Sequence, residues 1–115
     1  MLLQKMKVEV LCTTDDPIDT LEYHQHIAKE KLPIKVLPAF RPDKAYATDD
    51  PSSWNSYMGK LSSAANITVN SFDTLMAALE NRINYFHALG CRLSDHGLEQ
   101  IPFHDTDDSF TVNTL

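Results

Sequence analysis

The first half of the chain has the apolar pattern of two β-strands separated by a helix. Residues 6–12 carry apolar side chains at every second position, and residues 34–40 are apolar almost throughout, which is typical of a parallel strand covered on both faces. Between them, apolar residues at helical spacing predict a helix from Asp16 and Pro17 to about Lys31. This order predicts two parallel strands joined by a crossover helix.

The second half of the chain predicts two helices and a third strand. Asp50, followed by a proline, is a helix-start signal, and a loop is expected over residues 62–70. Ser71 caps the clearest helix, Gly90 supplies a left-handed C-terminal cap, and residues 91–94 then predict a short strand. The apolar stripe of that helix, in steps of three and four, consists of Phe72, Leu75, Met76, Leu79, Ile83 and Phe86.

Length and charge narrow the class of protein. A chain of 115 residues is at most one domain, with its ordered part predicted over residues 1–97. Residues 98–115 hold four acids and no lysine or arginine, and we expect this acidic tail to be irregular or disordered. The net charge is −6 and the ten basic residues are scattered, which argues against nucleic-acid binding. Without a membrane-length apolar run or a signal-peptide core, the expected location is cytoplasmic, with no membrane partner.

The two cysteines are predicted to be free, buried thiols. Cys12 falls late in one predicted strand and Cys91 at the start of another. If these strands are parallel, the two sulfur atoms lie at opposite ends of the sheet and cannot form a disulfide.

Each of the three predicted strands ends in polar residues. Asp15 follows the first strand, Arg41 the second, and Asp95 with His96 the third. Because the carboxyl ends of parallel strands meet at one edge of a sheet or barrel, we expect these side chains to share a site. Asp16 is assigned to the helix cap, which leaves Asp15 as the candidate at the edge of the sheet.

Each candidate also has a purely structural interpretation. The planar fork of Arg41 can bind a carboxylate with two parallel hydrogen bonds, or it can form an ion pair with Asp43 or Asp16. Asp95 beside His96 can carry protons, or the pair can be a capping aspartate and a packed histidine. Residue spacing alone leaves these alternatives open.

A metal site is not expected in this chain. His24 and His26 fall in a predicted helix, where side chains two residues apart point about 200° away from each other. His87 and His104 lack ligand spacing, and no glycine-rich phosphate loop, paired CxxC or GxSxG motif is present.

Three stretches of the chain closely resemble uronate isomerase, also called glucuronate isomerase, a divergent family of the amidohydrolase superfamily. They are TTDDPIDTLEYH at residues 13–24, IKVLPAFRPDKA at residues 34–45, and GCRLSDHGL at residues 90–98. The resemblance extends from Met6 to about Gln100 and follows the order of the three strand ends.

The resemblance implies a fold and a reaction. The implied fold is a (β/α)₈ TIM barrel of the α/β class, of which this chain would supply about three parallel strands with crossover helices. The implied reaction is the aldose–ketose isomerisation of D-glucuronate to D-fructuronate and of D-galacturonate to D-tagaturonate, in hexuronate catabolism. It proceeds by proton abstraction beside a carbonyl and return of the proton through an enediol.

The resemblance also implies roles for individual residues. Arg41 would bind the uronate carboxylate, Asp95 would be catalytic as a proton carrier or a partner of substrate hydroxyls, and His96 would support it. The family holds a divalent metal, often zinc, with an HxH pair on the first barrel strand and an aspartate on the last. This chain contains neither element, so no metal is expected in it, and it resembles an internal piece of the barrel.

An incomplete barrel leaves strand edges without partners. We therefore expect self-association through the open sheet edges, or helices repacked over them, and no isomerase activity from this chain alone. The alternative is a small α/β module that binds sugar acids, or associates with itself, without catalysis.

Overall fold

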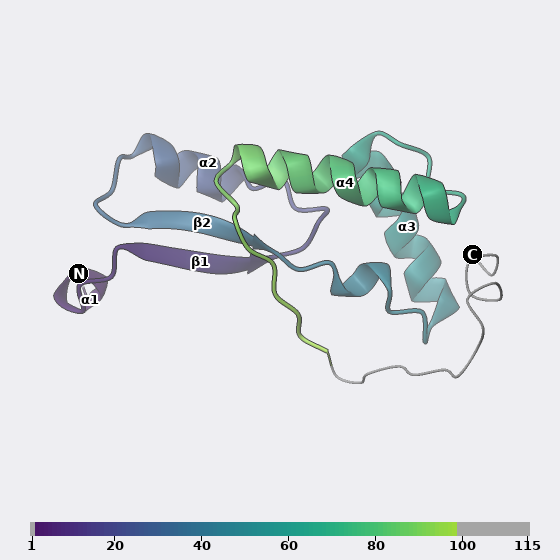
Figure 1. The fold of residues 1–115 in the computed structure, drawn as a ribbon, viewed down its shortest axis with the longest axis horizontal. Helices are drawn as coiled ribbons and strands as arrows, with labels where there is room; N and C mark the ends of the chain where they lie inside the picture. The colour runs from purple at the N-terminus through teal and green to yellow at the C-terminus, as the bar shows by residue number, and fades with distance from the viewer. Residues whose placement is uncertain (1, 99–115) are drawn as a thin grey trace.

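Two parallel strands and a set of helices make up the part of the chain that the structure, a computed structural model, describes, residues 2–98 (Figure 1). This confirms the predicted α/β class. Apart from Leu98, the predicted acidic tail lies outside the described residues. In chain order the elements are α1 (Leu2–Lys5), β1 (Val10–Asp15), α2 (Glu22–Lys29), β2 (Lys35–Phe40), the 3₁₀ helix η1 (Asp43–Ala45), α3 (Pro51–Ala65) and α4 (Phe72–Ala88).

The two strands pair in parallel, as predicted, but β1 starts and ends later than its apolar pattern suggested. Its register runs from Val10 opposite Lys35 to Asp15 opposite Phe40. Lys7 has a left-handed φ of 57°, which interrupts the extended chain before the strand. The pairing then includes polar residues because a strand ladder is built from backbone groups, which every side chain type provides.

The predicted third strand is reduced to a single parallel bridge between Phe40 and Ser94. The Phe40 amide donates to the Leu93 carbonyl at 3.1 Å, and the Asp95 amide donates to the Phe40 carbonyl at 3.2 Å. Just upstream, the Cys91 amide still donates to a carbonyl in the last turn of α4. Only the residues around Ser94 are therefore placed to pair with β2.

Helix α2 begins at Glu22, five residues after Pro17, its predicted first residue. The Asp16 carboxylate accepts the Ile18 amide at 3.1 Å, so it caps a turn. The guanidinium of Arg82 donates to the carbonyls of Pro17 and Asp19 at 2.6 and 2.8 Å. Those carbonyls are the acceptors that the first turn of a helix would need, so the helix begins only after this turn.

The capping predictions for α3 and α4 are confirmed. Asp50 accepts the amides at positions 52 and 53, and Ser71 forms a reciprocal capping box with Thr74. Gly90 adopts the expected positive φ, at 102°. The predicted loop over residues 62–70 is wrong at its start, because α3 continues to Ala65. Among residues 2–98, no helix is long and apolar enough to cross a membrane.

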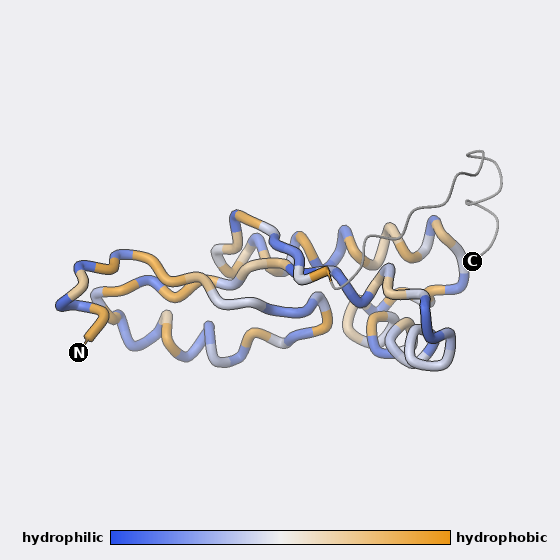
Figure 2. Tube along the Cα trace, turned by 90° about the horizontal axis from the view of Figure 1, so that it is seen from below, coloured by the Kyte–Doolittle hydropathy of each residue, from blue (hydrophilic) through white to orange (hydrophobic). Residues whose placement is uncertain are grey.

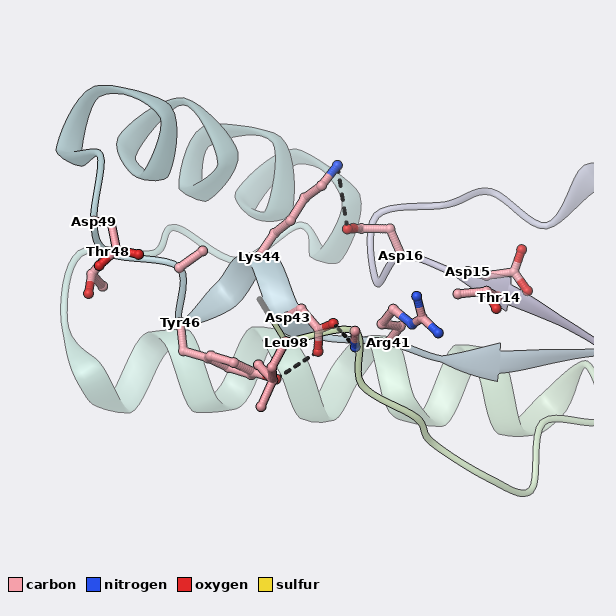
Figure 3. A pocket seen from close by; sticks show the side chains of 12 residues that line it. Thr14, Asp15, Asp16, Arg41, Asp43, Lys44, Tyr46, Thr48, Asp49 and Leu98 are labelled. Atoms are coloured by element: carbon pink, nitrogen blue, oxygen red, sulfur yellow. Dashed lines mark hydrogen bonds and ion pairs between the residues drawn. The ribbon is translucent and has the colours of Figure 1, made fainter. Parts of the chain in front are cut away.

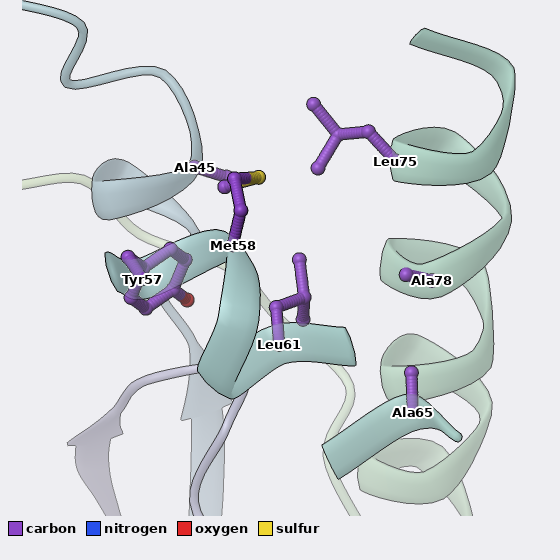
Figure 4. Packing of buried hydrophobic residues seen from close by; sticks show 7 residues of the cluster. All are labelled: Ala45, Tyr57, Met58, Leu61, Ala65, Leu75 and Ala78. Carbon is purple, nitrogen blue, oxygen red and sulfur yellow. The ribbon is translucent and has the colours of Figure 1, made fainter. Parts of the chain in front are cut away.

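The main hydrophobic core lies between α3 and α4 (Figure 4). Leu61 and Ala78 are fully buried where the two helices meet. A second cluster joins α4 to the end of the sheet, with the Phe40 and Phe86 rings edge-to-face at 5.2 Å. The members of the main cluster are Ala45, Tyr57, Met58, Leu61, Ala65, Leu75 and Ala78.

The buried face of α4 differs from the predicted apolar stripe. Phe72, Met76 and Ile83 are exposed, whereas Arg82 is buried at 6% exposure among apolar neighbours. Apolar spacing alone did not predict this face, because an arginine is normally expected on the exposed side of a helix.

Strand β1 is far less covered than the helices or the end of β2. Val10 and Leu11 of β1 are 49% and 39% exposed, and Figure 2 shows hydrophobic positions along much of this end of the molecule. Cys12 is also exposed, which corrects its predicted burial, whereas Cys91 is buried and both thiols are free. Too little of the described chain packs on β1 to bury a side chain on it, so the open-edge prediction of self-association remains a prediction.

Candidate active site

A pocket of about 560 Å³ lies where the two strands end (Figure 3). Its walls come from residues 14–16 at the end of β1, residues 41–49 after β2, and residues 97–98 of the C-terminal segment. These are the three chain segments that were predicted to share one site, and the structure brings them together. The pocket therefore collects charged side chains from segments that are far apart in sequence.

Arg41 lines the pocket and forms an ion pair with Asp95, which, like His96, is not among the residues that line it. Arg41 donates from Nε to Oδ1 of Asp95 at 3.2 Å and from Nη2 to Oδ2 at 2.6 Å, which is a bidentate pair. The two side chains are 34% and 39% exposed. The hydrogen bond from Arg41 lowers the pKa of Asp95, and the same bond raises the pKa of Arg41. Asp95 is therefore an ionised carboxylate at neutral pH.

The partner of Arg41 differs from those that the sequence suggested for a structural ion pair. Its carboxylate partner is Asp95, from a segment 54 residues away, rather than Asp43 or Asp16. Two of the three guanidinium nitrogens bind Asp95, while Nη1 has no hydrogen-bond partner within residues 2–98. Arg41 thus holds one carboxylate and presents a further donor group.

Asp43 sits beside this pair and receives three hydrogen bonds. The Tyr46 hydroxyl donates to Oδ1 at 2.7 Å, His96 Nδ1 lies 2.9 Å from Oδ1, and the Gly97 amide donates to Oδ2 at 2.6 Å. Partial burial alone would raise the pKa of Asp43, but these hydrogen bonds lower it to about 2. Burial and the bond to Asp43 raise the pKa of Tyr46 to about 12.

Asp15 lines the pocket, as expected, and its carboxylate contacts Thr13 and His24. The Thr13 hydroxyl donates to Asp15 Oδ2 at 2.6 Å, and His24 Nε2 lies 2.6 Å from the same hydroxyl and 3.6 Å from the carboxylate. His24 therefore links α2 to the end of β1.

Asp16 also lines the pocket, although it was assigned to a helix cap. The Tyr57 hydroxyl donates to its Oδ1 at 2.7 Å, and Lys44 Nζ lies 4.0 Å from its Oδ2. Burial raises the pKa of Tyr57, so its hydroxyl stays protonated and remains a donor. These contacts connect α3 to the pocket.

Sequence reasoning missed Asp43, Lys44 and Tyr46 as members of the site. Their position directly after Arg41 was a usable signal for the first two, because residues following a strand end line the same edge. Tyr46 carries no local signal, since it is drawn to the site by a hydrogen bond to Asp43.

The described residues do not form a metal centre. Within residues 2–98, no three His, Cys, Asp or Glu side chains are placed to hold one ion. His24 and His26 lie in α2, as predicted, and His24 faces Thr13. No chemical step is therefore assigned to a metal held by these residues.

The architecture and the site together define an α/β protein with a charged pocket at the carboxyl ends of parallel strands. The sequence matches the glucuronate isomerase family over residues 1–115, and the chain belongs to this family. It is 45% identical to the uronate isomerase of Bacteroides thetaiotaomicron over 108 residues, covering 94% of this chain and 23% of that protein. It is 48% identical to the uronate isomerase of Caldanaerobacter subterraneus over 108 residues, covering 91% of this chain and 22% of that protein.

Two solved structures share the fold. The crystal structure of uronate isomerase from Thermotoga maritima has a TM-score of 0.83 and 34% identity, covering 96% of this chain and 24% of that one. The structure of glucuronate isomerase from Caulobacter crescentus has a TM-score of 0.79 and 25% identity, covering 96% and 23% respectively. The likeness confirms the predicted fold class, an α/β segment of a (β/α)₈ barrel, although it holds two strands and a bridge instead of three strands. The chain spans about a quarter of the length of these relatives.

Proposed function

We propose that this chain contributes one wall of a uronate isomerase active site, which interconverts aldose and ketose uronates such as D-glucuronate and D-fructuronate, or D-galacturonate and D-tagaturonate. Membership of the glucuronate isomerase family supports this proposal. The observation that carries it is the bidentate Arg41–Asp95 pair beside a pocket of about 560 Å³. A pocket of that size is large enough for a single sugar acid.

In this proposal Arg41 binds the carboxylate of the sugar acid. Its Nη1 is the donor that Asp95 does not occupy, and a guanidinium prefers planar, bidentate contact with a carboxylate. Nη1 and the remaining N–H of Nη2 form a second edge of the guanidinium, where the carboxylate of a sugar acid can bind while Asp95 keeps Nε and Nη2.

Asp95 then acts on the protons of the substrate. In the reaction, a base removes the proton from the carbon beside the carbonyl, and the electron pair of that C–H bond forms the C=C bond of an enediol while the C=O π pair moves to the carbonyl oxygen, which takes up a proton. A proton is then added to the former carbonyl carbon while the neighbouring hydroxyl loses its proton. An ionised carboxylate can accept the first proton or hold a hydroxyl group, and pairing with Arg41 keeps Asp95 ionised.

The complete activity is proposed for an assembly larger than these residues. The family's divalent metal, expected to be zinc, would have to come from elsewhere in such an assembly, and this chain alone is expected to be inactive. Hexuronate catabolism in the cytoplasm remains the predicted setting. The exposed Val10 and Leu11 of β1 favour a second candidate, a sugar-acid-binding or self-associating module without catalysis.

Calorimetric titration of the chain with D-glucuronate tests the proposed pocket. We expect weak binding, on the order of millimolar, that falls at least about tenfold in Arg41→Met and is absent with D-glucose, which lacks the carboxylate. Arg92→Met, which removes an exposed guanidinium bound to His87 and Cys91 carbonyls, is the matched control and should bind normally. Equal binding by Arg41→Met and wild type, or no binding at all, would contradict a retained sugar-acid pocket.

A further inference from the structure

Asp43 connects two chain segments that have no backbone pairing with each other at this point. Asp43 opens η1, directly after β2, while His96 and Gly97 follow the bridge at Ser94. The contacts from Asp43 to His96 and Gly97 span 53 and 54 residues of sequence. The bridge ends at Asp95, and the Asp43 carboxylate continues the attachment beyond it through the Gly97 amide.

The backbone of Gly97 lies close to the side chains of Arg41 and Asp43. A Cβ at Gly97 would lie 2.9 Å from Nη1 of Arg41 and 3.6 Å from Oδ2 of Asp43. The backbone of residue 97 therefore packs directly on the guanidinium, at a distance that a larger residue would not allow without moving Arg41. The Gly97 amide bond to Asp43 holds the backbone in that place.

His96 and Tyr46 complete the attachment. The Tyr46 hydroxyl is 3.0 Å from His96 Nδ1, and both groups lie within hydrogen-bond distance of Asp43 Oδ1. His96 was predicted to support the site, and its ring bonds to Asp43 and Tyr46 rather than to Asp95. The residue immediately after Asp95 is thus fixed by contacts that Asp43 organises.

We propose that Asp43 is a positioning residue of the proposed isomerase site, which locks residues 95–97 against Arg41 so that Arg41 is held in the pocket wall with Asp95 paired to it. This inference rests on the proposed function for its catalytic meaning, while the locking itself is a property of the chain. Asp43 is not assigned contact with the substrate.

The electrostatic alternative predicts the opposite effect on ligand binding. Asp43 is a negative charge near Arg41, so neutralising it would strengthen the attraction of Arg41 for a carboxylate if charge were its only influence. If Asp43 acts by position, the same substitution weakens binding, because Arg41 and residues 95–97 lose their fixed geometry. The sign of the change therefore separates the two explanations.

Nuclear magnetic resonance of the 115-residue chain tests the locking directly. In the wild type, the Gly97 amide signal should stay constant as the pH is lowered to about 3 and shift with a midpoint of about 2, because it reports the Asp43 carboxylate. Asp43→Asn should abolish this titration and also move the Arg41 Nε–H signal. Asp73→Asn is the matched control, since it removes one acidic charge at an exposed position outside the pocket. It should leave both signals in place.

Titration with D-glucuronate gives the functional half of the test. We expect Asp43→Asn to bind at least about threefold more weakly than wild type, and Asp73→Asn to bind equally well. Tighter or unchanged binding by Asp43→Asn would overturn the positioning role while leaving the proposed function intact.

The two proposals can fail separately. If the wild type does not bind D-glucuronate, the proposed function fails, and the Gly97 and Arg41 signals still decide the locking. A Gly97 amide that titrates near pH 4, the ordinary range of an aspartate, would overturn the locking, as would an Arg41 Nε–H signal unchanged in Asp43→Asn.

Discussion

The helical end and the sheet end of the molecule differ sharply in how well they are packed. In the helical end, Leu61 of α3 and Ala78 of α4 are fully buried. In the sheet end, counting residues 2–98, no residue of β1 is buried. Strands with open faces and edges depend on neighbours that this part of the chain does not supply. The difference teaches that the helices hold the fold together, while the strands position the site and remain open to further partners.

Arg82 is the main polar connection between the two ends. Its side chain donates to Pro17 and Asp19 in the β1–α2 connection and to Ala64 of α3 at 3.1 Å, and it stacks 4.3 Å from the Tyr85 ring centroid. Burial lowers the pKa of this guanidinium, yet it has carbonyl partners on all three nitrogens. It ties the segment that carries Asp15 and Asp16 to the helical core.

The largest expected difference between the two ends comes from removing the same side chain in each. Leu61→Ala should lower the free energy of unfolding by about 3 kcal/mol, because it leaves a cavity in the α3–α4 core. Leu11→Ala, at a position 39% exposed, should cost less than about 1 kcal/mol. Urea denaturation of both variants measures the contrast.

A comparable loss in the two leucine variants would break the comparison. It would mean that the outer face of β1 is covered in solution, most simply by a second copy of the chain. Repeating the denaturation over a wide range of protein concentrations checks this, since self-association makes the midpoint depend on concentration.

A smaller effect is expected when the connection between the two ends is cut. Arg82→Met should lower the free energy of unfolding by about 2 kcal/mol, because it leaves the Pro17, Asp19 and Ala64 carbonyls without their donors. Arg92→Met, at an exposed arginine, should change it by less than about 0.5 kcal/mol.

Amide exchange sharpens this second prediction. In Arg82→Met, the amides of Asp19 and Leu21 should exchange faster than those in the middle of α3, since the turn before α2 loses its attachment. Uniform acceleration throughout the chain would show instead that Arg82 supports the whole core.

Elements governed by local signals could be predicted from the sequence, and those governed by distant partners could not. Asp50 and Ser71 began their helices as expected because a capping side chain acts on amides two or three residues away. The start of α2 was missed because Arg82, more than 60 residues later, takes the carbonyls that a helix would use. The predicted third strand is only one bridge, because the amide of its first residue, Cys91, donates to the Phe86 carbonyl in α4.

The candidate site divides in the same way. Arg41 and Asp95 were predictable because polar residues that follow neighbouring parallel strands meet at one edge. Their direct pairing and the role of Asp43 were not, because both depend on how residues 95–97 pack against η1. Their catalytic and substrate-binding roles stay predictions.

The most direct test of the central claim is the activity of a chimaera in which residues 2–98 replace the matching quarter of Thermotoga maritima uronate isomerase. We predict that it converts D-glucuronate to D-fructuronate, and that Arg41→Met or Asp95→Asn lowers its kcat/KM at least about 100-fold, while Arg92→Met stays within about tenfold of the parent chimaera. A chimaera that folds and melts like the parent enzyme but is inactive, or that keeps full activity without Arg41 and Asp95, would contradict the claim.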